Sequence, residues 1–124
     1  MANTNMYPAV TPYLVVPDGD VALTFVKAAF GATEQACQRN QDGSVGHAEM
    51  RIGDSLIMVG QAGGQWKARA AALYLWVDNV DAAYQRALAA GAASESAPED
   101  KPYGQRMAGV EACGVTWWLA SPIS

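Results

Sequence analysis

Two stretches of the chain share one pattern, a short β-rich run that continues into an amphipathic helix. The runs span residues 11–16 and 73–77, and their β-branched and aromatic side chains suit the half-buried surface of a sheet. After each run, apolar residues recur with the helical period of 3.6. Gly31 and Gly91 predict where the two helices end, and Asp18 or Asp20 and Asn79 or Asp81 are the candidate N-caps.

The two stretches are copies of one unit. Tyr13-Leu14-Val15-Val16 is matched by Tyr74-Leu75-Trp76-Val77, and further strands are expected behind each helix, at 34–38, 46–52 and 55–59 and at 93–97, 106–110 and 116–120. A Pro-rich loop is expected at 98–104. The pattern therefore predicts a single α+β domain over 1–124 with two tandem βαβββ modules, about 9–60 and 72–122, joined by a linker or lid at about 61–71.

Composition places the chain among globular proteins. With 124 residues and 51% hydrophobic residues it can build a core without a metal or disulfides. The net charge of −4 has the wrong sign for a nucleic-acid binder. No apolar run approaches the roughly 18 residues of a membrane span, and the first residues lack the features of a signal peptide. Cys37 and Cys113 are far apart and predict two reduced thiols, so we expect a cytoplasmic protein that contacts neither nucleic acid nor membrane.

Five segments stand out, at residues 10–16, 25–32, 46–54, 73–81 and 98–100. Together they resemble the vicinal oxygen chelate superfamily, the glyoxalase, bleomycin-resistance and dioxygenase fold. The resemblance covers most of the chain, and the third strand is similar to a glyoxalase-like branch with a His-Ala-Glu motif at His47-Ala48-Glu49. It implies a curved eight-stranded cup with the helices on its outer face.

Metal-dependent members of that family supply His, Gln or Glu ligands at four positions. Carried onto this chain, the resemblance places these positions at Thr11, Met58, Ala72 and Trp118, none of which is a usual ligand of a divalent metal. We therefore expect no cofactor and no metal site, although a divalent metal held by displaced ligands stays open. A two-ligand site at His47 and Glu49 is weak, because catalytic zinc uses three protein ligands.

The inward face of the cup is expected to be rich in aromatic side chains. Such a lining suits a planar or amphipathic small molecule, although the same rings could instead fill a collapsed core. Trp66 on the linker could close over a ligand or pack on a second subunit, and Arg106 could meet an anionic group at the mouth of the cup or stay solvated. The candidate ligand-binding residues are Tyr13, Arg51, Met58, Trp66, Tyr74, Trp76, Arg106 and Trp118.

The third strand alternates polar and apolar residues. His47, Glu49 and Arg51 share one face of it, so His47 is the candidate base and Glu49 its partner if that face is concave. A strand with one solvated face shows the same alternation.

Three functions follow from these observations. The first is a metal-free protein that binds a small aromatic or amphipathic molecule, as the bleomycin-resistance branch does. The second is a lyase or isomerase that uses His47 and Glu49, and the third is a structural or regulatory module without a cavity. The family resemblance and the low content of charged residues, 16%, further predict a homodimer.

Overall fold

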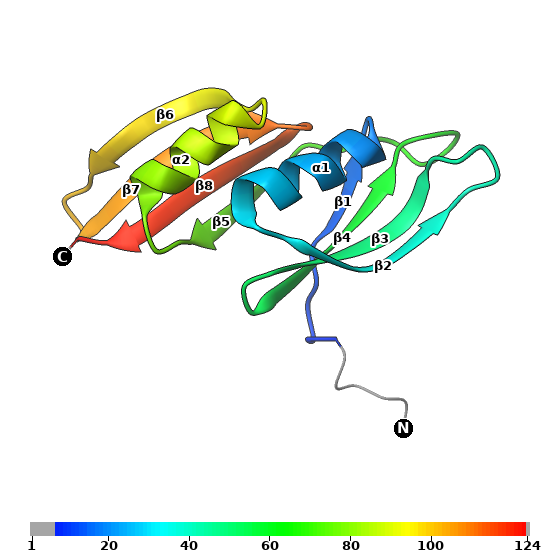
Figure 1. The fold of residues 1–124 in the computed structure, drawn as a ribbon, viewed down its shortest axis with the longest axis horizontal. Helices are drawn as coiled ribbons and strands as arrows, with labels where there is room; N and C mark the ends of the chain where they lie inside the picture. The colour runs from blue at the N-terminus through cyan, green and yellow to red at the C-terminus, as the bar shows by residue number, and fades with distance from the viewer. Residues whose placement is uncertain (1–6, 124) are drawn as a thin grey trace.

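The computed structural model describes residues 7–123 and shows two βαβββ modules side by side (Figure 1). The N-terminal module is an α+β unit whose sheet has the strand order β1-β4-β3-β2, and the C-terminal module repeats it with the order β5-β8-β7-β6. The elements in chain order are β1 (Tyr13–Val16), α1 (Gly19–Phe30), β2 (Thr33–Arg39), β3 (Val45–Ile52), β4 (Ser55–Gln61), β5 (Ala71–Trp76), α2 (Val80–Ala89), β6 (Ala93–Asp100), β7 (Gln105–Ala112) and β8 (Val115–Pro122).

The expected fold class and the repeat are confirmed, with three differences of detail. Hydrogen-bonded ladders run only within each module, so the eight strands form two four-stranded sheets rather than one continuous sheet. The segment Pro98–Asp100, expected in a loop, is the end of β6, where it pairs with β7 across an irregular register. Strand β1 begins at Tyr13, two residues later than expected.

Both helices begin at the same kind of cap. Asp18 accepts a hydrogen bond from the backbone N–H of Val21, and Asn79 accepts one from Ala82. Helix α1 ends at Gly31, whose φ of 68° is the left-handed conformation that favours glycine.

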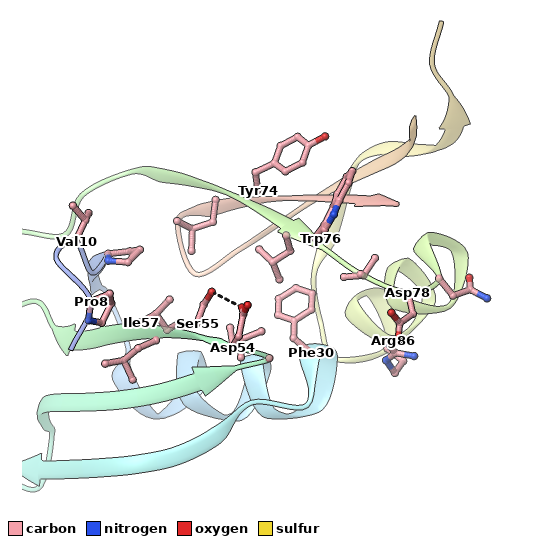
Figure 2. A pocket seen from close by; sticks show the side chains of 18 residues that line it. Pro8, Val10, Phe30, Asp54, Ser55, Ile57, Tyr74, Trp76, Asp78 and Arg86 are labelled. Carbon is pink, nitrogen blue, oxygen red and sulfur yellow. Dashed lines mark hydrogen bonds between the residues drawn. The ribbon is translucent and has the colours of Figure 1, made fainter. Parts of the chain in front are cut away.

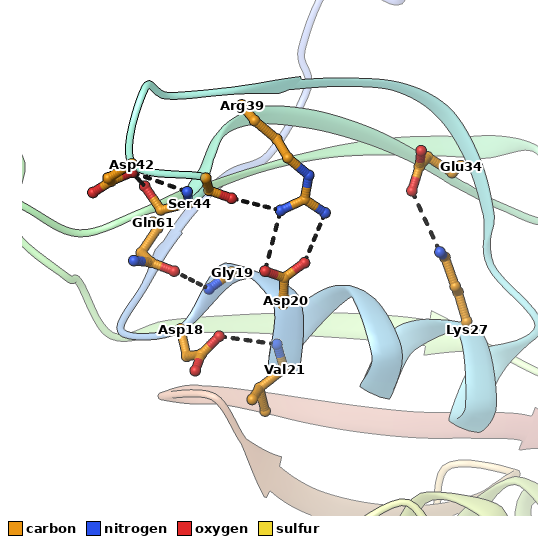
Figure 3. Close-up of polar contacts among 11 residues, drawn as sticks. Asp18, Gly19, Asp20, Val21, Lys27, Glu34, Arg39, Asp42, Ser44 and Gln61 are labelled. Atoms are coloured by element: carbon orange, nitrogen blue, oxygen red, sulfur yellow. Dashed lines mark hydrogen bonds and ion pairs between the residues drawn. The ribbon is translucent and has the colours of Figure 1, made fainter.

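Close contacts fix α1 against its sheet (Figure 3). Gly19 lies so near β3 that a Cβ atom there would come within 2.6 Å of the Val45 Cβ. Its backbone N–H donates to the Gln61 side chain at 2.8 Å, and Arg39 of β2 forms an ion pair with Asp20 at 2.8 Å. These contacts set the start of the helix over β2, β3 and β4.

One hydrophobic core joins the two modules. Both helices lie on the same side of the two sheets and contact each other, and Arg86 of α2 donates to the Ala29 carbonyl of α1 at 3.2 Å (Figure 1). Trp117 of β8 is 1% exposed and packs against Phe25 and Phe30 of α1, with ring centroids 5.9 and 5.2 Å apart. The opposite face of each sheet is therefore left uncovered by helices. Within residues 7–123, no helix is long and apolar enough to span a membrane.

Candidate functional site

The helix-free face of the N-terminal module carries most of the polar chemistry. Along β3, Ala48 and Met50 enter the core, so His47, Glu49 and Arg51 project from the other face. The sheet register then aligns three side chains of neighbouring strands. Tyr13 of β1 pairs with Met58 of β4, which pairs with Glu49 of β3. The structure therefore brings the candidate residues of this module together on one surface.

Glu49 is the centre of a hydrogen-bond network. Only 6% of its surface is exposed, and its carboxylate accepts from three side chains. The Tyr7 hydroxyl lies 3.1 and 3.0 Å from its two oxygens, His47 Nε2 lies 3.1 Å from Oε2, and Gln35 Nε2 donates to Oε1 at 3.3 Å. Arg51 donates to the Gln35 side-chain oxygen at 2.9 Å. A buried carboxylate is stable only with such partners, and here every partner is a donor.

The same network determines the pKa of Glu49. Burial by itself would raise this pKa, but the hydrogen bonds donated by His47, Tyr7 and Gln35 outweigh burial and hold the pKa below its ordinary value of 4.5. The hydrogen bond to the carboxylate raises the pKa of the Tyr7 hydroxyl in turn. Glu49 is therefore ionised and Tyr7 protonated at neutral pH.

Both ring nitrogens of His47 have partners within the protein. An ionised carboxylate only accepts hydrogen bonds, so Nε2 carries the proton that points to Glu49. In the neutral ring Nδ1 then accepts from the Tyr13 hydroxyl at 3.3 Å. His47 in this state has no free lone pair for the proton of a substrate.

Aromatic rings border this polar network. Tyr13 is 40% exposed and packs edge-on against Trp66 of the linker, with ring centroids 5.9 Å apart. Gly60 makes room for Tyr13, since a Cβ atom at Gly60 would come within 3.0 Å of the Tyr13 hydroxyl. The linker tryptophan therefore lies beside the candidate site, with 53% of its surface exposed.

The helix-free face of the C-terminal module is rich in aromatic rings. Tyr74 and Trp76 of β5 lie with ring centroids 6.2 Å apart and are 53% and 61% exposed. Trp118 of β8 pairs with Tyr74 in register and covers Gly109, where an added Cβ would meet the indole ring at 2.5 Å. The Tyr74 hydroxyl donates to the Gln105 side chain. This face offers flat apolar surfaces, with the Glu95 side chain beside Gly109 and Glu111 two residues farther along β7 on the same side.

A groove of about 840 Å³ separates the two modules below β5 (Figure 2). Tyr74 points away from this groove, toward the helix-free side, while Phe30 and Ile57 point into it. Pro8 and Val10 of the N-terminal segment line one end, and Asp54 and Ser55 of the β3–β4 turn lie nearer the middle, between Ile57 and Phe30. The groove thus lies between the two modules, and Tyr74 and Trp76 of the aromatic face are among the residues that line it.

Arg106 lies apart from the other candidate residues. On β7 it shares the side of Ala108 and Val110, which are core residues under α2. Its guanidinium forms ion pairs with Asp81 of α2 and Asp100 of β6, both at 3.0 Å. The structure therefore places Arg106 on the helix side of the sheet, away from the aromatic face.

The chain offers poor ligands for the metal that the fold suggests. At the four ligand positions that the resemblance implies, Met58 and Trp118 have apolar side chains, and the other two are Thr11 and Ala72. Within residues 7–123, no three His, Cys, Asp or Glu side chains gather as a metal site. The donor set does not fit a catalytic divalent metal, which needs three carboxylate or imidazole ligands.

Comparison with known proteins decides the family. The model of the Glyoxalase/Bleomycin resistance protein/Dioxygenase superfamily matches residues 8–119. The chain belongs to this superfamily. Two relatives are 34% identical to it over 96% of the chain: the uncharacterized protein Mb0911c of Mycobacterium bovis, of which 86% is covered, and the uncharacterized protein Rv0887c of Mycobacterium tuberculosis, of which 77% is covered.

Solved structures of other proteins share the fold. TioX from Micromonospora is similar with a TM-score of 0.79 and 25% identity, over 94% of this chain and 99% of TioX. A gene product from Arabidopsis thaliana gives a TM-score of 0.71 and 25% identity, over 92% and 98% of the two chains. A superfamily enzyme from Burkholderia phytofirmans, 19% identical over 92% and 96% of the chains, matches in fold with a TM-score of 0.70.

Three polar members of the two faces have no clear signal in the sequence. Tyr7 reaches Glu49 from a segment far from β3 in sequence, Gln35 reaches it from the neighbouring strand β2, and Gln105 reaches Tyr74 from β7. The Gln35 position depends on a register shift between Glu34 and Ala36, which no local pattern reveals. For Tyr7 the one local sign is Pro8, which favours an extended backbone at the preceding residue.

Proposed function

We propose that this protein binds a small aromatic or amphipathic molecule, without a metal, on the helix-free faces of its two modules. The observation that carries the proposal is the exposure of aromatic rings there, with Tyr74, Trp76 and Trp66 each more than half exposed. A monomeric protein rarely leaves such rings in water unless they contact a partner or ligand. The amphipathic rings suit stacking on a planar molecule.

Homodimerisation is part of this proposal. The helix-free faces are open surfaces, and a site that holds a drug-sized ligand encloses most of its surface. A second copy laid against the faces would enclose them and bury the exposed rings. The two free cysteines further suit a reducing compartment, so we place the protein in the cytoplasm.

Tryptophan fluorescence tests ligand binding directly. We expect saturable quenching by planar aromatic compounds such as 2-methoxynaphthalene, with Trp117 shielded in the core. Trp76→Phe should lose part of the quenching. A control at Tyr103→Phe, in the β6–β7 loop, should keep all of it, and a protein whose emission no aromatic compound changes would contradict the proposal.

Light scattering tests the dimer. We expect a mass of about 26 kDa, twice the 13.1 kDa chain. Trp76→Arg should shift the mass toward the monomer, because it places a charge in the proposed interface. Val21→Arg is the matched control, since Val21 is also an exposed apolar residue but lies on α1, on the opposite side of the molecule. If both variants change the measured mass equally, the helix-free faces do not form the dimer interface.

The alternative function is acid–base catalysis by His47 and Glu49 in a lyase or isomerase. The 3.1 Å contact between His47 Nε2 and Glu49 favours it, since a carboxylate partner is typical of a catalytic imidazole. Binding fits better, because His47 Nδ1 is already hydrogen-bonded to Tyr13. Turnover of a substrate would support the enzyme if His47→Ala abolishes it and Tyr13→Phe changes its rate.

A further inference from the structure

The buried state of Glu49 depends on a residue from outside the sheet. Tyr7 lies 42 positions earlier in the chain, yet its hydroxyl contacts both carboxylate oxygens. The residues that follow it, 8–12, belong to no helix or strand. Among residues 7–123, the backbone hydrogen bonds of this segment begin at Pro12, whose carbonyl accepts from Met58 at 2.9 Å. The Tyr7 contact is therefore made by an exposed stretch outside the sheet, residues 7–10, which can open locally at lower cost than a strand.

We propose that Tyr7 occupies the place of a ligand hydroxyl, and that the bound molecule presents a phenol-type hydroxyl to Glu49 when the N-terminal segment moves away. This inference rests on the proposed function and names its ligand class. A phenol is the group that the structure itself shows at this acceptor. Tyr7 is thus an internal competitor for the site.

Charges around the carboxylate favour a neutral donor over a cation. Glu49 contributes one negative charge. The guanidinium of Arg51 is linked to it through the Gln35 side chain, which bonds to both residues. A cationic ligand would add a second positive charge beside Arg51, whereas a hydroxyl replaces the Tyr7 hydrogen bonds without changing the charge. Hydrogen bonds from a hydroxyl to a carboxylate are also short and strong.

The surroundings supply the apolar part of the same ligand class. Tyr13 and Trp66 pack edge-on beside the network, and Met58 lies between Tyr13 and Glu49 in the sheet register. A ring whose hydroxyl reaches Glu49 would therefore cover Met58 and meet the two aromatic rings. Tyr7 competes with the ligand for the same acceptor. The apparent affinity for the ligand is therefore the intrinsic affinity multiplied by the fraction of molecules in which Tyr7 has left the site.

Calorimetric titration with two matched probes tests the inference at neutral pH. We expect 2-naphthol to bind about tenfold more tightly than 2-methoxynaphthalene, which has the same rings but no donor for Glu49. Tyr7→Phe should tighten 2-naphthol by about 3- to 10-fold and leave 2-methoxynaphthalene unchanged, because only the hydroxyl competes. Glu49→Gln should remove most of the preference for the hydroxyl.

Two controls separate these effects from general changes at the surface. Tyr103→Phe removes an exposed hydroxyl of the other module, whose partner is the Met107 sulfur, and Glu34→Gln neutralises an exposed carboxylate of β2 that pairs with Lys27 on the helix side. Both should bind the two probes like the unchanged protein. Tyr7→Ala gives a second way to free the carboxylate and should also tighten 2-naphthol. Tyr7 is 39% exposed, so neither of its variants is expected to unfold the protein.

The outcomes distinguish this inference from the proposed function. Equal affinity for the two probes, or no response of 2-naphthol to either Tyr7 variant, would overturn the ligand class while aromatic binding stands. Weaker binding of 2-naphthol to Tyr7→Phe would show that Tyr7 is part of the site and not its competitor. Failure of both probes to bind any variant would overturn the proposed function as well.

Discussion

The two modules have the same topology but opposite chemistry at equivalent positions. In the N-terminal sheet the register aligns Tyr13, Met58 and Glu49, and in the C-terminal sheet it aligns Tyr74, Trp118 and Gly109. The place of the buried carboxylate is therefore taken by a glycine under an indole ring. One module presents a hydrogen-bond acceptor and the other a flat apolar surface, which together suit an amphipathic ligand. The comparison teaches that a repeated fold fixes where side chains point and leaves their chemistry free.

The largest effect is expected at the residue that makes the two modules one folding unit. Trp117→Ala should lower the free energy of unfolding by about 3–5 kcal/mol, because it leaves a cavity between Phe25 and Phe30 of one module and the sheet of the other. Urea denaturation measures the loss. The exposed Trp76→Ala should cost less than about 0.5 kcal/mol, and similar losses in both variants would contradict a shared core.

The glycine beneath Trp118 is expected to be the next most sensitive position. Gly109→Ala should cost about 1–3 kcal/mol and shift the tryptophan emission, because the new methyl group would lie 2.5 Å from the ring. Gly63→Ala is the matched control, with no atom within 4 Å of an added Cβ. An unchanged emission and stability in Gly109→Ala would mean that the indole does not need this space.

The carboxylate of the other module should show its effect through pH. The folded-state pKa of Glu49 is lowered, so its stabilisation is complete above about pH 5 and disappears as the pH falls through the folded-state pKa. Glu49→Gln should therefore cost about 1–2 kcal/mol at pH 7, and the difference from the unchanged protein should shrink in acid. Urea titrations at a series of pH values measure it. A difference that stays constant down to pH 3 would be inconsistent with an ionised Glu49.

The smallest effects are expected at the N-caps of the two helices, where the modules are equivalent. Asp18→Ala and Asn79→Ala each remove the side chain that accepts from the first turn of a helix, so each should cost about 1 kcal/mol. Thermal denaturation of the two variants is the measurement. Costs that differ by more than about 1 kcal/mol would show that the caps are not equivalent.

Much of the fold could be predicted because its signals are local. The strand alternation, the helical apolar faces, the caps at Asp18 and Asn79 and the stop at Gly31 each depend on residues close together in sequence. The shared face of His47, Glu49 and Arg51 follows from the same alternation. The apolar residues of each strand also predict which of its two faces packs against the helices, because the core lies there.

The site itself was only partly predictable, because it depends on contacts between distant segments. Arg106 could be recognised as a candidate, but its partners Asp81 and Asp100 lie on other elements and hold it on the helix side. Likewise the linker position of Trp66 says nothing of its contact with Tyr13.

The two βαβββ modules and the family resemblance could be recognised from the chain alone, because periodicity and residue type are properties of the sequence. Only the tertiary structure decided that the strands form two separate sheets, that Trp117 joins the modules, and that Tyr7 and Gln35 satisfy Glu49. The physical reason is that burying a charge requires donors in three dimensions, and these donors come from wherever the fold brings the chain back.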